Sequence, residues 1–224
     1  MRRWIASLVV LLSAGLAQLC DQPFSPLREG WVWEYRLLDA KGQSAGNVTA
    51  RKVLYGNSFV TQLRGSDANG GEIRNDTRYV CTPEGIRTAG EGLGGDGVTV
   101  RSIKVSGIEI PEADAWQVGA SWQQKVEIEG EGRFGVLPVS GRMTLETTFR
   151  IAAQEAVAVP AGRFNAFRVE SLNSLRFQTS IPLPLGSPTF RATYWYALDV
   201  GVVKTVFGNG NDLRVSELLR LPRR

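Results

Sequence analysis

The feature that most constrains the fold is an alternation of apolar and polar residues along most of the chain after residue 30. Residues 31–37, 122–133 and 143–151 all alternate in this way. Side chains two positions apart lie on the same face of a strand, so this period favours strands with one buried face. The pattern predicts an all-β fold, a curved antiparallel sheet or an open half-barrel of about a dozen strands with little helix.

Turn residues separate the alternating runs and indicate hairpins. Gly56-Asn57 predicts a tight turn between strands at 48–55 and 58–63. Further strands are expected at 77–81, 85–88, 98–105, 164–170, 175–181, 190–198 and 202–207, and loops at 65–71, 90–97 and 182–188. Residues 213–220 are the best helix candidate.

The chain after the first 20 residues is expected to form one domain. Residues 21–224 are long enough for a single all-β unit. The stretch Gly30-Trp31-Val32-Trp33 is echoed by Gly119-Ala120-Ser121-Trp122. This echo suggests two similar halves that meet near residues 111–118, although it is too short to establish a repeat.

Residues 1–20 have the layout of a secretory signal. Two arginines precede an apolar run at 4–12, and small residues follow at 13–17. The apolar run is too short to span a bilayer comfortably. We therefore expect an exported protein of the periplasm or cell envelope, with cleavage either after Ala17 or before Cys20.

The two cysteines, Cys20 and Cys81, leave two alternatives. Cys20 follows the apolar run as the lipidated residue of a lipoprotein does, but the bulky Leu19 stands where such junctions have a small residue. A lipid on Cys20 would be the chain's link to a membrane. Alternatively, Cys20 and Cys81 form a disulfide that closes a loop of about 60 residues and contributes roughly 2–4 kcal/mol.

The composition argues against several classes of function. The chain has no histidine, so the commonest general base and metal ligand are missing. The net charge of +4 falls to about +2 without Arg2 and Arg3, too little for a nucleic-acid footprint. Residues Glu127, Glu129 and Glu131 alternate on one strand, as a solvated face does. We predict a non-catalytic protein with no cofactor or metal, and we assign no catalytic residue.

Two segments near the C-terminus carry a resemblance to a known family. Residues 159–164 read Val-Pro-Ala-Gly-Arg-Phe, and residues 194–204 read Tyr-Trp-Tyr-Ala-Leu-Asp-Val-Gly-Val-Val-Lys. Together with Pro-Leu-Arg-Glu-Gly-Trp-Val-Trp at 26–33, they resemble a family of bacterial exported proteins and lipoproteins. The resemblance implies a curved sheet similar to the half-barrels of periplasmic lipoprotein carriers. It implies no catalytic residues.

The same segments supply the candidate site. Tyr194 and Tyr196 lie on one face of the predicted strand and Trp195 on the other, while Phe164 returns to the core after the Pro160 turn. These four aromatic residues either fill a core or form a wall for an apolar or glycan ligand. We predict an envelope protein that binds a lipid or other apolar molecule in a concave sheet. The alternative is a structural or assembly factor that acts through protein–protein contacts.

Overall fold

The computed structural model describes residues 19–90, 99–134, 137–182, 186–208 and 212–223. These residues form an antiparallel sheet, which confirms the predicted fold class. The strands are β1 (Val32–Leu38), β2 (Ser44–Tyr55), β3 (Ser58–Asp67), β4 (Glu72–Thr82), β5 (Gly85–Thr88), β6 (Thr99–Gly107), β7 (Ile110–Pro111), β8 (Ser121–Phe134), β9 (Leu137–Val159), β10 (Gly162–Thr179), β11 (Thr189–Ala197), β12 (Gly201–Phe207) and β13 (Arg214–Arg223). A single 3₁₀ turn, η1 (Ala113–Ala115), interrupts the described strands.

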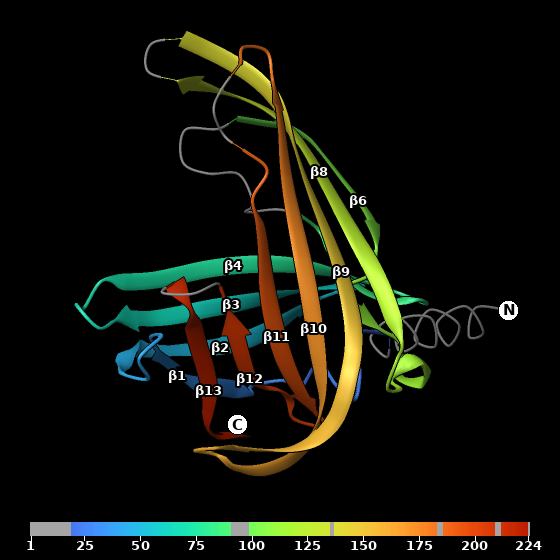
Figure 1. Cartoon of the computed structure of the whole chain (residues 1–224). Coiled ribbons are helices and arrows are strands. Elements are labelled where there is room, and N and C mark those ends of the chain that lie inside the picture. The colour runs from blue at the N-terminus through green and yellow to red at the C-terminus, as the bar shows by residue number, and fades with distance from the viewer. Residues whose placement is uncertain (1–18, 91–98, 135–136, 183–185, 209–211, 224) are drawn as a thin grey trace, which may run out of the picture.

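The sheet is two meanders joined where the chain's first and last strands meet. Its order is β6-β8-β9-β10-β11-β12-β13-β1-β2-β3-β4-β5-β7. β13 pairs antiparallel with β1, with Leu218 opposite Tyr35. Figure 1 shows β13 and β1 side by side at the base of the molecule. This one pairing joins a first meander, β1 to β5 with β7, to a second meander, β6 with β8 to β13, in a continuous sheet.

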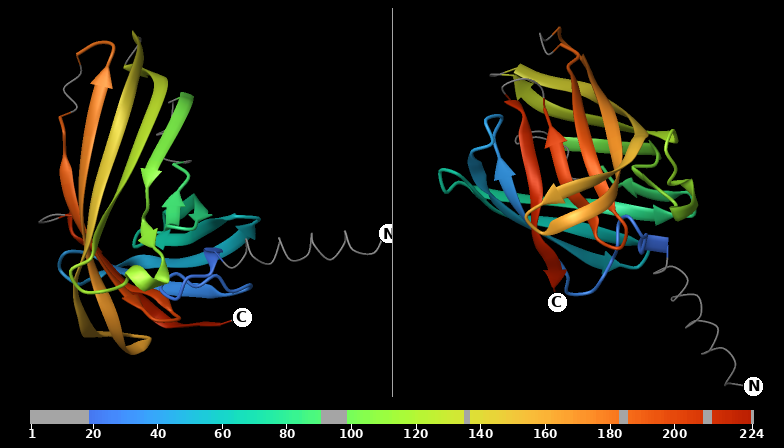
Figure 2. Two further views of the ribbon diagram at one scale, coloured as in Figure 1. Left: turned by 90° about the vertical axis from the view of Figure 1, so that its right-hand side faces the viewer. Right: turned by 60° about the horizontal axis from the view of Figure 1, so that its bottom comes forward.

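The sheet is strongly curved, so that one half faces the other. In Figure 1, β2, β3 and β4 run across the molecule while β8, β9 and β10 rise steeply beside them, and Figure 2 shows the resulting concave side. At the base, the β9–β10 hairpin curls toward β13, where the Ala161 amide donates to the Leu218 carbonyl at 3.0 Å. The edge strands β6 and β7 are not paired with one another.

Several predicted hairpins are present. β2 and β3 meet at Gly56-Asn57, and β4 and β5 pair across residues 83–84. β11 and β12 pair across residues 198–200, where Gly201 has a positive φ of 90° that a glycine adopts without strain. The segments 1–18, 91–98 and 183–185 lie outside the described residues, so most of the predicted signal and parts of two predicted loops lie there.

The predicted division of β10 into strands at 164–170 and 175–181 is wrong, and β9 extends beyond the alternating run at 143–151 in both directions. Each is one long strand, and the two pair along nearly their whole length. The pairing of β9 with β10 shifts register between Ile151 and Ala153, so the alternation of buried and exposed residues before the shift does not continue in step after it. In β10, Ser171 and Asn173 are residue types common in turns, but both are buried. Asn173 Nδ2 donates hydrogen bonds to Ser171 Oγ and to the Phe190 carbonyl of the neighbouring strand.

The helix candidate at 213–220 is a strand, and the predicted loop at 65–71 is shortened to residues 68–71. The first is β13, in which Leu218 is fully buried on one face and Glu217 carries ion pairs on the other. Pairing with β1 and β12 therefore overrides the local helix preference. β3 continues through Gly65, whose missing side chain is needed because a Cβ there would lie 2.0 Å from the Asn47 carbonyl oxygen.

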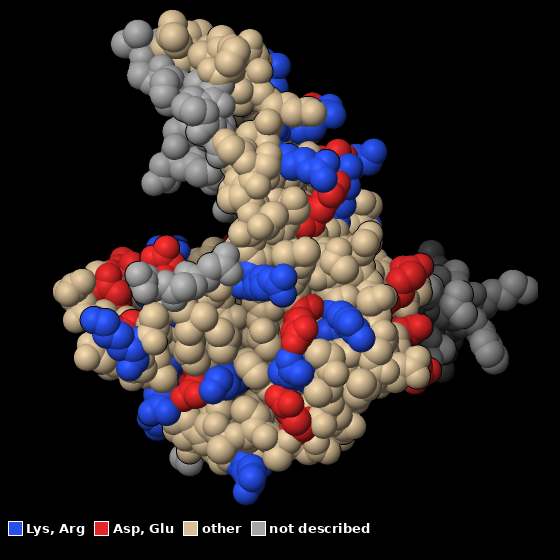
Figure 3. Space-filling model, in the orientation of Figure 1, with Lys and Arg blue, Asp and Glu red and all other residues tan. Residues whose placement is uncertain are grey.

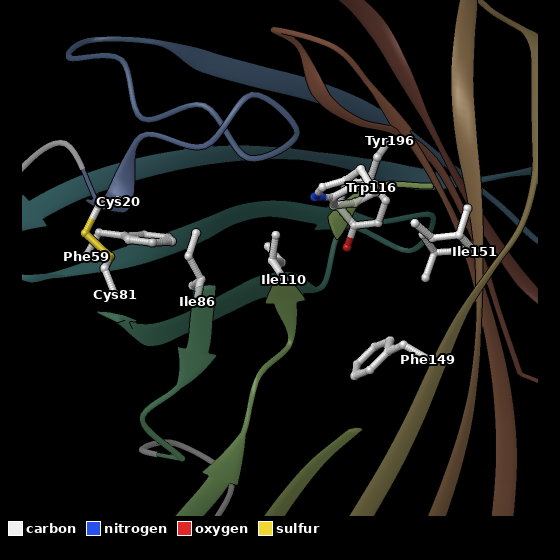
Figure 4. Close-up of a cluster of buried hydrophobic side chains, with 10 residues drawn as sticks. Cys20, Phe59, Cys81, Ile86, Ile110, Trp116, Phe149, Ile151 and Tyr196 are labelled. Atoms are coloured by element: carbon white, nitrogen blue, oxygen red, sulfur yellow. A yellow bond between two sulfur atoms is a disulfide. The ribbon is translucent and has the colours of Figure 1, made fainter. Parts of the chain in front are cut away.

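The buried side chains form two clusters. The first joins β3, β4, β5, β7, β9, β10 and β11 around Phe59, Trp116 and Ile151, with the Cys20–Cys81 disulfide at one end (Figure 4). The second lies around Trp33, Val203 and Leu218 at the base. Segment 111–117, predicted as a plain connection, contributes Trp116 to the first cluster, where it is 8% exposed. Within the described residues, we find no helix of the length and hydropathy that crossing a bilayer requires.

Replacing Leu218 by alanine tests the β1–β13 junction. Leu218 is 0% exposed, whereas Leu221 on the same strand is 50% exposed. We expect Leu218→Ala to lower the free energy of unfolding by about 2–4 kcal/mol, because it leaves a cavity at the base. Leu221→Ala should change it by less than about 0.5 kcal/mol in the same denaturant titration. Equal effects of the two substitutions would contradict the described packing of β13.

Candidate ligand cavity on the concave face

A cavity of about 200 Å³ opens between the two halves of the curved sheet. β1 to β4, β11 and β12 all contribute to its lining, together with the segment before β1. Its walls are largely aromatic, formed by Phe24, Trp33, Tyr35, Phe59, Tyr194 and Tyr196. An apolar cavity of about 150 Å³ is enough to hold a benzene ring. The site therefore has room for a small ring, a short alkyl chain or one end of a larger ligand.

Side-chain hydrogen bonds across the sheet hold the cavity's walls in place. The Trp33 indole Nε1 donates to the Val200 carbonyl at 2.7 Å, and the Tyr35 hydroxyl donates to the Val202 carbonyl at 2.8 Å. The first bond connects β1 with the β11–β12 turn, and the second connects β1 with β12. Burial raises the pKa of Tyr35, so its hydroxyl stays protonated and able to donate. Ligand sites are usually preformed in this way.

The structure places two of the four predicted wall residues at this cavity. Tyr194 and Tyr196 both line it, with ring centroids 6.0 Å apart. Trp195 lies on the opposite face of β11, where its indole Nε1 donates to Glu155 Oε1 at 2.9 Å. Phe164 packs against the second core cluster at the base. Trp195 and Phe164 are not among the residues that line the cavity.

The N-terminal strap, defined here as residues 19–31, covers one side of the cavity. Phe24 and Ser25 of the strap are part of the lining. The Phe24 ring also packs on Trp116 at a centroid distance of 4.3 Å, which ties the strap to the first core cluster. The Leu27 amide donates to Asp21 Oδ1 at 3.0 Å and shapes the strap locally.

A disulfide fastens the start of the strap to the sheet. Cys20 and Cys81 are bonded, their Cα atoms are 5.2 Å apart, and 61 positions separate them in sequence. Both residues are buried. A sulfur atom in a disulfide cannot also carry a thioether-linked lipid. In this structure, Cys20 is therefore disulfide-bonded and not lipidated.

Lys52 brings a cationic group into the aromatic cavity. It lies on β2, and its Nζ donates to Ser25 Oγ at 2.7 Å and to the Pro26 carbonyl at 3.1 Å. The same Nζ lies 5.4 Å from the centre of the Trp33 ring and 5.3 Å from that of Phe59. Burial lowers the pKa of Lys52 to about 7, because its ammonium loses hydration.

Glu109 brings a carboxyl group to the same lining. It lies immediately before β7, and its side chain hydrogen-bonds with the Tyr79 hydroxyl. Burial raises the pKa of Glu109 to about 7, since the charged carboxylate is poorly solvated there. Burial and the nearby Glu109 carboxylate also raise the pKa of Tyr79.

Sequence reasoning missed Lys52 and Glu109, although each leaves a signal. Lys52 continues the inward series of Val48 and Ala50 at every second position of β2. Glu109 stands between Ile108 and Ile110 in an apolar stretch. A charged residue in register with buried apolar neighbours is unusual enough to mark a candidate site.

A row of polar side chains extends from the cavity along the inner face. Thr147 Oγ1 donates to Asn173 Oδ1 at 2.9 Å, and Asn173 Nδ2 donates to Ser171 Oγ at 3.1 Å. Ser171 in turn hydrogen-bonds with Tyr194. The interior beside the cavity is therefore partly polar and does not form a continuous apolar groove.

The charges on the opposite face are arranged in pairs. Figure 3 shows acidic and basic groups intermingled over the face that it displays. Glu129 pairs with Arg142, Glu131 with Arg101, and Glu127 with Lys125. The predicted solvated face of β8 thus consists of ion pairs. The described residues contain no group of three potential metal-ligating side chains.

The chain resembles known proteins in its fold. No protein-family model matches it, and no curated protein matches it. A solved structure from Bacteroides fragilis, described as an exported protein with a YmcC-like fold, is 16% identical, with a TM-score of 0.56 over 91% of this chain and 100% of that one. A structure from Parabacteroides distasonis, described as a lipoprotein, is 18% identical, with a TM-score of 0.56 over 90% and 99% of the two chains. The chain shares its fold with these proteins.

The disulfide generates the first prediction about this site. Replacing Cys20 and Cys81 together by serine should lower the free energy of unfolding by about 2–4 kcal/mol, because the unfolded chain regains the freedom of the closed loop. A reductant should destabilise the unaltered protein but not the double variant. Intact mass of the exported protein should show two hydrogens fewer than the reduced chain. A lipid adduct on Cys20 would contradict this assignment.

Glu109 generates a prediction about pH. Its pKa is raised from 4.5 to about 7 on folding, so its contribution to stability is present below pH 4.5 and is lost as pH rises through 7. Glu109→Gln should remove this loss, making the fall in unfolding free energy between about pH 4.5 and 7 smaller by roughly 1–3 kcal/mol. Lys52 titrates in the opposite sense above this window, between about 7 and its usual 10.5.

The matched control is Glu112→Gln, which removes an exposed carboxylate three positions away. Denaturant titrations at a series of pH values compare the three proteins. If Glu109→Gln and Glu112→Gln have the same pH profile, the burial of Glu109 is wrong.

Proposed function

We propose that the chain is an exported, non-catalytic envelope protein that binds a small ligand with an apolar part in the cavity of its concave sheet. The observation that carries the proposal is the cavity itself. It lies within a continuous sheet, its aromatic lining comes from strands far apart in sequence, and the bonds of Trp33 and Tyr35 hold its walls. Aromatic walls with a few placed polar groups are typical of small-molecule sites.

Two observations support the exported location. Residues 1–20 follow the three-part pattern of a secretory signal. The Cys20–Cys81 disulfide is a feature of proteins that fold in oxidising compartments. The fold shared with proteins described as exported or as a lipoprotein is consistent with this location. With Cys20 in a disulfide, the proposed form is released into the periplasm and carries no lipid.

The polar groups of the cavity favour binding over catalysis. Lys52 is held by two uncharged oxygens, and Glu109 by a tyrosine hydroxyl. Covalent catalysis requires a nucleophile within hydrogen-bond reach of a base. Among the described residues that line the cavity, Lys52 Nζ lies within hydrogen-bond reach of the Ser25 hydroxyl, but it donates to that oxygen and to the Pro26 carbonyl and is not positioned to accept a proton from Ser25. The arrangement instead suits recognition, in which fixed donors and acceptors orient a ligand.

Filling the cavity tests the proposal. Ala50→Phe places a ring among the lining residues, and Thr49→Phe places the same ring on the exposed face of the same strand. Overpacking at Ala50 should cost about 1–3 kcal/mol of stability, so the fold should survive. Native mass spectrometry of protein isolated from its own envelope should show a non-covalent small molecule on the unaltered chain and on Thr49→Phe, and little on Ala50→Phe.

Equal occupancy of all three proteins would mean that the ligand binds elsewhere. Protein without any bound small molecule, isolated together with a cross-linked envelope protein, would favour the role of an assembly factor.

A further inference from the structure

The charge of Lys52 has no protein partner of opposite sign. Among the described residues, the ion pairs join other groups, and the hydrogen bonds of Lys52 Nζ go to the Ser25 hydroxyl and the Pro26 carbonyl. Two uncharged oxygens satisfy hydrogen bonds but leave the positive charge uncompensated. Lys52 is half-buried, and lysines withdrawn from water are usually paired, because removing an ammonium from water is costly.

The position of Lys52 shows where a partner would bind. Its side chain lines the cavity, and the Trp33 and Phe59 rings flank its Nζ at centroid distances of 5.4 and 5.3 Å. An anionic group at this point would contact the ammonium while an attached apolar part packed on the rings. Hydrogen bonds between charged groups are shorter and stronger than those between neutral ones.

Glu109 limits how much negative charge a ligand can carry. Its carboxyl group lines the same cavity and has no cationic partner among the described residues. A second anionic group on the ligand would share this cavity with the Glu109 carboxylate, and like charges in one site repel. A hydroxyl or amide donor would instead be accepted there. The two residues together select for a single anionic group.

We infer that the cavity binds a monoanionic amphiphile, with its carboxylate or other acidic group on Lys52 and its apolar part against Trp33 and Phe59. This inference rests on the proposed function, since it names the ligand class for the same cavity. It also gives Lys52 a role beyond holding the strap.

Matched acids and amides test the inference. Phenylacetate and phenylacetamide differ in charge but hardly in shape, as do hexanoate and hexanamide. In calorimetric titrations of the mature protein, we expect each acid to bind about tenfold to a hundredfold more tightly than its amide, the usual worth of a hydrogen bond to a charged group. The preference should be lost in Lys52→Met, with the affinity for the amides unchanged.

Lys41→Met is the matched control, because Lys41 is exposed in the β1–β2 turn and should keep the preference. Equal binding of acid and amide to the unaltered protein, with both weakened by Ala50→Phe, would overturn the inference and leave the cavity as a ligand site. Acid preference that survives Lys52→Met would overturn the role of Lys52. Absence of binding for all four compounds would overturn the proposed function as well.

The affinities of acid and amide are first compared on the unaltered protein, so the test of the ligand class does not depend on whether Lys52→Met folds.

Discussion

The structure depends on the pairing of its last strand with its first. β13 joins β1, and without this ladder β1 to β5 with β7 and β6 with β8 to β13 would be two separate meanders. Because both belong to one sheet, its curvature turns β2, β3 and β4 toward β10 and β11, and the inner faces enclose a cavity. The buried Leu218 and the Ala161–Leu218 hydrogen bond secure the junction from the side of the β9–β10 hairpin.

The cavity combines features that oppose one another energetically. Its aromatic walls favour apolar groups, yet Lys52 and Glu109 lie among them, and burial moves the pKa of each toward neutrality. Neither has an ionic partner among the described residues, so each destabilises the folded protein while the site lacks a complementary ligand. The disulfide and the packing of Phe24 on Trp116 hold the strap in place and offset part of this cost. Proteins commonly accept such local destabilisation where they bind something.

Local pattern predicted the strands better than it predicted their arrangement. Period-two burial indicated the sheet, the β2–β3 and β11–β12 hairpins, and the shared face of Tyr194 and Tyr196. It failed where tertiary contacts determine the structure. Residues 213–220 form a strand because they pair with β1 on one side and β12 on the other. Asn173 is typical of turns in sequence, but in the structure it is buried in a strand and hydrogen-bonded there. The same period separates Trp195 from the two tyrosines, whereas the position of Phe164 at the base depends on how the sheet curves, which no local period encodes. Lys52 was detectable from its register with Val48 and Ala50.

The most direct test of the account is an experimental structure of the exported protein, isolated from its own envelope without unfolding. The account predicts non-protein density in the cavity, in contact with Lys52 Nζ and the Trp33 and Phe59 rings, beneath a strap held by the Cys20–Cys81 disulfide. A cavity closed by rearranged side chains, with Lys52 and Glu109 joined in a direct ion pair, would contradict it.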